Sequence, residues 1–178
     1  MKQHKLNKQA GASMVEIVVT IIIIAIGLLG VASLQANTMR YLKVANQRTE
    51  ATQAAYDLSE RMRANGQGVK DPISGAASYT YTTAYATTVA SLPPIPTCGG
   101  PRCTPAEVAA IDVNDWLRGL SNRLTDGAGY IVPVVPTGYD VIVMWKEANL
   151  TIVDPACPTA TAPAPGIGVR CFTVRFSP

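Results

Sequence analysis

A single acidic residue, Glu16, stands near the start of the apolar run GASMVEIVVTIIIIAIGLLGVASLQ, residues 11–35. A charged side chain in a membrane segment is expensive, so an ionisable residue at this position indicates a function. A carboxylate can form an ion pair with a cation, and such a pair is far stronger in a low-dielectric helix bundle than in water. Glu16 is therefore a candidate docking group for a positively charged partner.

Four cysteines, at positions 98, 103, 157 and 171, all follow the apolar run. Export across a membrane would place them in an oxidising compartment, which favours disulfides, and three pairings are open to them. We favour Cys98–Cys103, which closes a tight Gly/Pro loop, and Cys157–Cys171, which fastens a long loop to the last predicted strand. Zinc is the alternative, but the spacing is poor for zinc and the one histidine, His4, lies near the N-terminus.

The sequence offers little for enzyme chemistry. No histidine follows His4, which excludes a histidine-based triad from the rest of the chain, and no phosphate-binding glycine motif occurs. Asp112, Asp115 and Asp126 raise the alternative of calcium binding, but their context is typical of a solvated helix surface. The sequence predicts a protein that is not an enzyme and that has no cofactor or metal.

Positive charge is concentrated at the N-terminus. The formal net charge is +3, with 15 basic and 12 acidic side chains, and Lys2, Lys5 and Lys8 all lie in the first eleven residues. Without these lysines the basic and acidic side chains are equal in number, so we expect no nucleic-acid partner. The positive flank predicts that the N-terminus stays in the cytoplasm and that the rest of the chain lies across the membrane.

The apolar run is long enough to cross a membrane. Residues 17–39 carry no charge, and residues 17–34 are apolar apart from Thr20 and Ser33, close to the roughly 20 residues that a spanning helix needs. A secretory signal peptide is one alternative, but its apolar region would be shorter and would end in a clear A-x-A-like site. A plain membrane anchor is another, and it leaves Glu16 unexplained.

The predicted helix continues beyond the membrane segment. Apolar residues at spacings of three and four predict one buried face, which Arg48 interrupts. They are Tyr41, Val44, Ala51, Ala55, Leu58 and Met62. Asp57 and Arg61 are spaced for an ion pair along the helix.

Asn65-Gly66 predicts the end of this helix, because both residues tolerate the left-handed conformation that ends helices. We therefore expect one helix from about residue 12 to residue 64. The predicted parts are a basic leader (1–11), a membrane and assembly half of the helix (12–39), an amphipathic half (40–65) and an exported domain (66–178).

The exported domain begins with a stretch rich in Ser, Thr, Ala and Pro. Within it SYTYTTAYATTVA, residues 78–90, partly alternates Tyr and Thr and allows one edge strand. Tyr79, Tyr81 and Tyr85 are expected to cover the long helix, with a binding face as the alternative. SLPPIPTCGGPRC is a loop by composition.

A helix and three strands are predicted for the rest of the domain. Thr104 is a candidate N-cap, Pro105 fits the first helical position and Glu107 completes a capping box, so we expect a helix over about residues 105–124. GYIVPVV, YDVIVMWKE and GVRCFTVRFS are typical of short strands, the first two joined at Pro136-Thr137-Gly138. The fold class is therefore α+β, with a small antiparallel sheet packed on the long helix.

The segment KQAGASMVEIVVTIIIIAIGLLG resembles the N-terminus of type IV prepilins, which have a short basic leader ending in Gly and a Glu as fifth mature residue. On this resemblance Gly11 is the last leader residue and Ala12 the first mature one, cleaved by prepilin peptidase and N-methylated. Ala12 departs from the Phe that the family most often has there. The resemblance also implies that Glu16 pairs with the Ala12 amine of a neighbouring subunit.

Three further blocks resemble minor pilins of the PilV type, which are type IV pilus modification or assembly proteins. They are IGLLGVASLQ, QRTEATQAAYDLSERMRAN and CTPAEVAAIDVNDWLRGLSNRL. The resemblance implies the type IV pilin-like fold and a role in a complex that primes pilus assembly at or near the tip. Its implied partners are other minor pilins, the major pilin and the inner-membrane assembly machinery. The protein would lie in the bacterial inner membrane, in contact with lipid, before it reaches the pilus at the cell surface.

Two other functions stay open on the sequence. A minor pseudopilin of type II secretion would share the N-terminus and the long helix. A pilus-tip adhesin or DNA-uptake pilin would use the Tyr/Thr segment or the Pro/Ala/Thr loop of residues 147–168, although a neutral mature chain argues against DNA.

Overall fold

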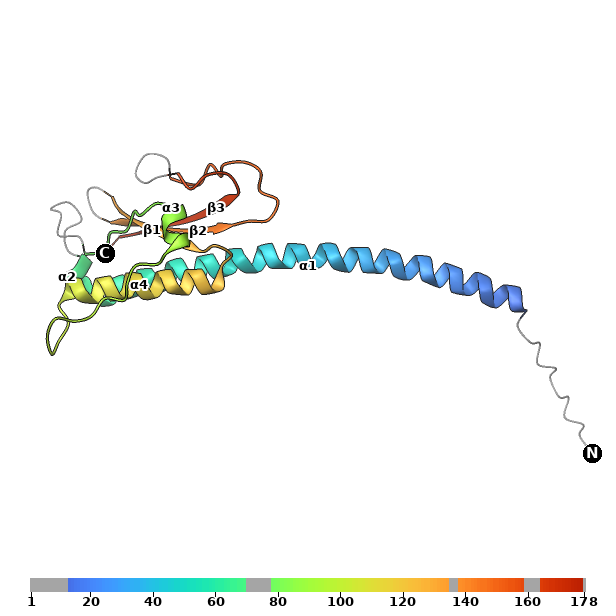
Figure 1. The fold of residues 1–178 in the computed structure, drawn as a ribbon, viewed down its shortest axis with the longest axis horizontal. Coiled ribbons are helices and arrows are strands. Elements are labelled where there is room, and N and C mark those ends of the chain that lie inside the picture. The colour runs from blue at the N-terminus through green and yellow to red at the C-terminus, as the bar shows by residue number, and fades with distance from the viewer. Residues whose placement is uncertain (1–12, 70–77, 135–137, 159–163, 178) are drawn as a thin grey trace, which may run out of the picture. The chain divides into compact units, whose positions relative to one another are not determined.

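Helix α1, Met14–Ala64, opens the computed structural model, which describes residues 13–69, 78–134, 138–158 and 164–177. The chain divides into two units, residues 1–43 and 44–178, and α1 contributes to both. Figure 1 shows the order of the elements along the chain. The expected helix, from about residue 12 to residue 64, ends where α1 ends.

In the first unit, α1 exposes every side chain as far as residue 43. Its first turn begins with a hydrogen bond from the main-chain nitrogen of Glu16 to Ser13 O at 3.0 Å. Thr20 and Thr38 donate their hydroxyl hydrogens to carbonyls three and four residues earlier, at 2.8 and 2.9 Å. The threonine hydroxyls are thus satisfied within the helix. Among the described residues, α1 is the one helix long and apolar enough to span a membrane.

In the second unit, one face of α1 is buried. Its apolar core residues are Ala51, Ala54, Ala55, Leu58 and Met62. Tyr41 was expected on this face, but this was wrong: Tyr41 lies in the first unit and is 77% exposed. Gln47 is buried instead and donates to Thr125 Oγ1 at 2.8 Å. A hydrophobic pattern could not indicate this polar residue, because its burial depends on a partner 78 positions away.

A three-stranded antiparallel sheet forms the other layer of this unit. The strands are β1 (Ala128–Pro133), β2 (Tyr139–Lys146) and β3 (Val169–Phe176), in the order β1-β2-β3. Ala128 pairs with Met144 across β1 and β2, and Tyr139 pairs with Phe176 across β2 and β3. The predicted fold class, a long N-terminal helix packed against a small antiparallel sheet, is confirmed. Pro136 and Thr137, in the predicted turn, lie outside the described residues, and Gly138 has a φ of +137°.

Both faces of β2 are buried, so its side chains do not alternate between core and solvent. Tyr139, Val141, Val143 and Trp145 join the core that includes α1 and helix α4. Ile142 and Met144 point the other way, into a smaller cluster with the disulfide of Cys157 and Cys171. This second cluster explains why the strand is apolar at nearly every position.

Helix α4, Pro105–Arg123, lies alongside the second half of α1, and in Figure 1 the sheet lies above both helices. Thr104 caps it through the predicted box, since its hydroxyl accepts from Glu107 N and Glu107 bonds back to Thr104 N. Two contacts fix its course: Asn65 donates to Pro105 O at 2.8 Å, and Arg123 lies 3.7 Å from Glu50. The two helices are therefore antiparallel.

Residues 78–90 do not form the edge strand that the sequence allowed. Only Tyr81 pairs there, exchanging two main-chain hydrogen bonds with Ile131 on β1 at 3.0 and 2.8 Å. Residues Tyr85–Ala90 form a short helix, α3, and Gly66–Val69 form another, α2. The buried Thr88 bonds the hydroxyl of Tyr81 at 3.0 Å, which holds this turn against the core. Tertiary contacts have here overridden the β-propensity of Tyr and Thr.

Candidate functional site

The first candidate site is the N-terminal half of α1, with Glu16 in its first turn. Glu16 is exposed, and within the described residues its carboxylate has no hydrogen bond or ion pair. Gly11 and Ala12, the expected cleavage site, lie outside the described residues. The structure therefore leaves the Glu16 carboxylate open to a partner from another chain.

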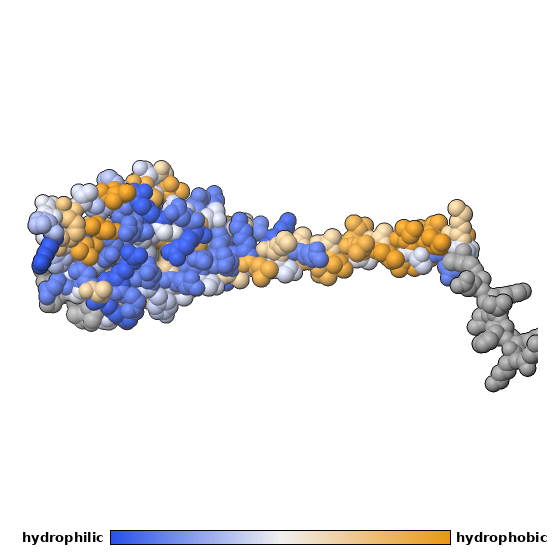
Figure 2. Space-filling model, turned by 90° about the horizontal axis from the view of Figure 1, so that it is seen from below, coloured by the Kyte–Doolittle hydropathy of each residue, from blue (hydrophilic) through white to orange (hydrophobic). Residues whose placement is uncertain are grey.

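Large apolar side chains surround this half of the helix. Figure 2 shows the stretch largely in the colour of hydrophobic residues. Those at least half exposed are Met14, Val15, Ile17, Val18, Ile21, Ile22, Ile23, Ile24, Ile26, Leu28, Leu29, Val31, Leu34 and Met39. A helix that is apolar all round needs lipid or other helices on every side. This surface can therefore serve both membrane insertion and packing into a helix bundle.

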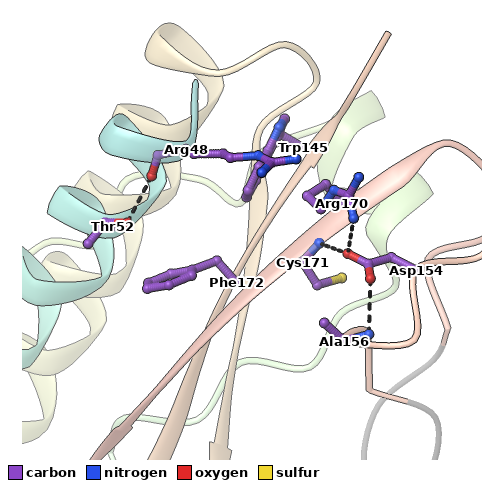
Figure 3. Close-up of a pocket in the computed structure, with 8 residues that line it drawn as sticks. All are labelled: Arg48, Thr52, Trp145, Asp154, Ala156, Arg170, Cys171 and Phe172. Atoms are coloured by element: carbon purple, nitrogen blue, oxygen red, sulfur yellow. Dashed lines mark hydrogen bonds and ion pairs between the residues drawn. The ribbon is translucent and has the colours of Figure 1, made fainter. Parts of the chain in front are cut away.

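A pocket in the second unit is the other candidate site. It has a volume of about 320 Å³ and lies where α1, β2 and β3 meet the loop after β2, as Figure 3 shows. Arg48 and Thr52 come from α1, Trp145 comes from β2, and the remaining lining residues belong to β3 and the loop. Of the lining residues, the sequence singled out Cys171 as a disulfide partner, and it offered the loop of residues 147–168 as part of an alternative binding surface. Arg48 was noted only as an interruption of the apolar stripe.

A charge network borders the pocket. The buried carboxylate of Glu147 accepts from Arg170 Nε and Nη2, at 3.1 and 2.9 Å, and lies 3.5 Å from Arg48 Nη2. Asp154 accepts from the main-chain nitrogens of Cys171 and Ala156, at 3.0 and 3.1 Å. The hydrogen bonds from Arg170 lower the pKa of Glu147 below its ordinary value, and in turn the hydrogen bonds to Glu147 raise the pKa of Arg170.

The four cysteines form two disulfides. Cys98 pairs with Cys103 and Cys157 pairs with Cys171, with Cα–Cα distances of 4.9 and 5.0 Å. In the first loop, Gly99 N donates to Glu107 Oε1 at 2.8 Å, which ties the loop to the start of α4. The second disulfide joins the loop after β2 to β3, one wall of the pocket.

The three aspartates considered for calcium are not gathered into one site. Asp112 accepts from the hydroxyl of Tyr79 at 2.6 Å and lies 3.6 Å from Arg61 Nη1. Burial raises the pKa of Tyr79, and the bond to Asp112 adds to this effect. Asp126 has a φ of 50° in the turn after α4. Within the described ranges, no three potential ligands of the His, Cys, Asp and Glu types come together around a metal position.

The tyrosines serve packing in the described part of the chain. Tyr79 is fully buried in the main core, and Tyr81 packs against it. Tyr85 donates its hydroxyl hydrogen to Asp126 O at 2.8 Å and packs on the smaller cluster. Tyr79 and Tyr81 therefore join the core that contains the long helix, as expected, whereas Tyr85 does not cover that helix and packs on the smaller cluster instead.

Comparison with known protein families identifies a pilin family. Residues 33–114 match the model of the Tt1218-like family, described as type IV pilin Tt1218. The matched residues run from the end of the apolar segment through the second half of α1 and into α4. The match supports a type IV pilin, and pilins are structural subunits rather than enzymes. No curated protein matches the chain, and no solved structure does.

Proposed function

We propose that this protein is a minor pilin of the PilV type, which helps to prime type IV pilus assembly in a complex at or near the tip. The pilin match over residues 33–114 supports the general role. The PilV-type assignment rests on the resemblance of three blocks of the sequence to such proteins. The N-terminal half of α1 and its exposed apolar surface fit both membrane anchoring and a place in a pilus.

The observation that carries the proposal is the unpaired Glu16 carboxylate beside a fully exposed apolar helix. Cleavage after Gly11 would create a new amine on Ala12, and that amine of a neighbouring subunit is the natural partner of Glu16. Inside a helix bundle an uncompensated carboxylate is strongly unfavourable, whereas the paired state gains from the low dielectric constant. Glu16 would therefore favour correct axial docking and help to draw the subunit out of lipid.

Processing and assembly are linked in this proposal, because the Ala12 amine that pairs with Glu16 exists only after cleavage. The basic leader with its three lysines keeps the N-terminus in the cytoplasm. Prepilin peptidase then removes the leader, and Ala12 is methylated. The processed subunit joins other minor pilins and the major pilin through the inner-membrane machinery, with the second unit on the far side of the membrane.

The test is to delete the gene and measure the major pilin sheared from the cell surface. The deletion is complemented with the wild type, with Glu16→Ala and with Glu60→Ala. Glu60 is a matched control, since it is an exposed acid on the same helix that pairs with Arg63 in the second unit. We expect surface pilin to fall on deletion and to return with the wild type and Glu60→Ala. Glu16→Ala should be cleaved normally and yet fail to restore pilin.

Unchanged surface pilin after deletion would contradict the priming role. Measuring secretion by a type II system and adhesion would then discriminate between a pseudopilin and a tip adhesin. Restoration by Glu16→Ala would instead contradict the docking role of Glu16 while leaving the priming role in place.

A further inference from the structure

Two cations lie just beyond the apolar stretch of α1 without a counter-charge. Arg40 and Lys43 are exposed, and neither forms an ion pair within the described ranges of the chain. The other basic residues of this helix, Arg48, Arg61 and Arg63, each pair with an acid. Arg40 and Lys43 are therefore the cations of α1 that remain available to an anion from another molecule.

Tyr41 lies between these two cations. It is 77% exposed, although the apolar stripe predicted that it would be buried, and its neighbours Met39 and Leu42 are exposed as well. Tyrosine has an apolar ring and a polar hydroxyl, and it is enriched where a membrane meets water. An exposed tyrosine next to unpaired cations is typical of the end of a membrane span.

The length of the uncharged stretch places these residues at such an end. Residues 17–39 carry no charge. At about 1.5 Å per residue they extend over about 35 Å, which crosses a hydrocarbon core of about 30 Å with a moderate tilt. Residues 40–43 then rise about 6 Å further, and one headgroup layer is about 5–7 Å thick. A membrane span of residues 17–39 thus brings residues 40–43 into a headgroup layer.

The direction of the side chains supports the same placement. Side chains of a helix point back toward its N-terminus, which in α1 is the side of the apolar stretch. Long Arg and Lys side chains lay their methylene groups along apolar surface and keep the charged group at the polar interface. In a headgroup layer the guanidinium of Arg40 and the ammonium of Lys43 would meet phosphate groups, which both kinds of cation bind.

Processing would make these two residues more important. Lys2, Lys5 and Lys8 all precede the proposed cleavage site. Removal of the leader would leave Arg40 and Lys43 as the side-chain cations next to the span. The processed subunit would then be held by side-chain cations in one headgroup layer only.

We infer that Arg40, Tyr41 and Lys43 form a headgroup anchor, which binds the phosphate groups of anionic phospholipids in the leaflet on the far side of the membrane. The headgroup anchor fixes the depth of the processed subunit and retains it in lipid until it docks. This inference rests on the proposed function, because it takes the apolar half of α1 to be a membrane span. Glu16 favours departure from lipid, and the headgroup anchor opposes it.

The test uses a photo-crosslinking amino acid in the full-length protein, expressed in cells that process prepilins. The crosslinker replaces Leu42 at the headgroup anchor, Ile26 within the apolar stretch, or Gln53, an exposed residue of the second unit. Membranes are irradiated, acyl esters are hydrolysed with alkali, and adducts are identified by mass spectrometry. We expect a glycerophosphate adduct at Leu42, a fatty acyl adduct at Ile26 and no lipid adduct at Gln53.

The three positions separate failure of the headgroup anchor from failure of the proposed function. If Ile26 captures acyl chains while Leu42 captures only protein, only acyl chains or nothing, the headgroup anchor is overturned and the membrane span stands. If Ile26 captures no lipid, the apolar half of α1 does not lie in a membrane. The proposed function then fails first, and the headgroup anchor is overturned with it.

Charge variants test whether the cations select the lipid. The purified protein with the crosslinker at Leu42 is placed in vesicles of equal parts phosphatidylglycerol and phosphatidylcholine, and the ratio of the two adducts is measured. We expect Arg40→Gln and Lys43→Gln each to lower this ratio about fivefold, the factor by which one cation strengthens contact with an anionic surface. Arg40→Lys should preserve the ratio.

Arg102→Gln is the control for net charge. Arg102 is an exposed cation of the second unit without an ion pair in the part of the chain that the structure describes. The ratio of the two adducts should stay at the wild-type value in this variant. Equal ratios in the wild type, Arg40→Gln and Lys43→Gln would overturn the headgroup anchor, and so would an equal decrease in Arg102→Gln.

Discussion

Trp116 on α4 donates its indole hydrogen to the main-chain oxygen of Ala54 on α1 at 2.9 Å, and both residues are buried. The far edge of the same ring covers Gly129 on β1, where a Cβ atom would collide with it. One side chain thus joins the two helices and the first strand. Ala54 is small enough to let α4 approach the backbone of α1, which makes the hydrogen bond possible.

Trp116→Phe is expected to lower the free energy of unfolding by about 1–3 kcal/mol, through the lost hydrogen bond and lost apolar area. The measurement is urea denaturation of the full chain in detergent, followed by far-UV circular dichroism. Trp145→Phe is the matched control, because its indole nitrogen has no partner to lose. An equal loss in both variants would contradict a specific role for the bond to Ala54.

Gly129→Ala is expected to destabilise the protein by about 1–3 kcal/mol, because the new methyl group overlaps the Trp116 ring in a packed core. Gly66→Ala is the control, since a Cβ there meets no atom within 4 Å. Thermal denaturation of both variants checks this pair. If Gly129→Ala is as stable as Gly66→Ala, the ring does not constrain that strand.

Glu147→Gln is expected to change how stability depends on pH. Hydrogen bonds from Arg170 lower the folded-state pKa of Glu147 below its ordinary value of 4.5, so its contribution is complete above about pH 4.5. The contribution is lost as the pH falls through the lower folded-state pKa. At pH 7 the variant should be less stable by about 2 kcal/mol, and the difference should shrink below pH 4.5.

The check is the free energy of unfolding of wild type and Glu147→Gln from pH 7 down to pH 3. Glu60→Gln is the control, because Glu60 is an exposed acid on α1. A constant difference between the wild type and Glu147→Gln across that range would show that the pairing with Arg170 does not contribute through ionisation.

Replacing Cys157 and Cys171 together with Ala is expected to destabilise the protein more than replacing Cys98 and Cys103. The sequence separations are 14 and 5, and loop-closure entropy predicts about 3 and about 2 kcal/mol for the two disulfides. The Cys157–Cys171 pair is also buried, so its replacement adds a loss of packing. Denaturation of each double variant under oxidising conditions measures the difference. A larger loss from the Cys98 and Cys103 pair would contradict the ranking.

Local signals in the sequence predict much of the fold. The capping box at Thr104 and Glu107 and the ion pair of Asp57 with Arg61 each depend on residues a few positions apart. The end of α1 at Ala64 was predicted as well, but for the wrong reason, because neither Asn65 nor Gly66 has a positive φ and Gly66 begins α2. The three strands follow from short apolar segments between turn residues. Residues 78–90 did not form the strand that their pattern allowed, because the outcome there depends on the pairing of Tyr81 with the distant Ile131 on β1.

The pocket could not be predicted from the sequence. Arg48 and Glu147 are 99 positions apart, and Glu147 and Arg170 are 23 apart. No motif links such distant residues, and each taken alone is typical of a solvated surface. Trp145 lies in the predicted strand YDVIVMWKE, and only the folded structure shows that its nitrogen is buried without an acceptor.

Asp154 also affects whether the edge of the sheet can pair with a strand of another molecule. Strand β3 is an edge strand, and at Cys171 its outward main-chain hydrogen is already bonded to the Asp154 carboxylate. The disulfide to Cys157 keeps this loop beside the strand. A β-strand from a second molecule therefore finds no free donor at that position and cannot extend the sheet there. At this position the loop and its disulfide therefore block edge-to-edge pairing of β3 with a second molecule.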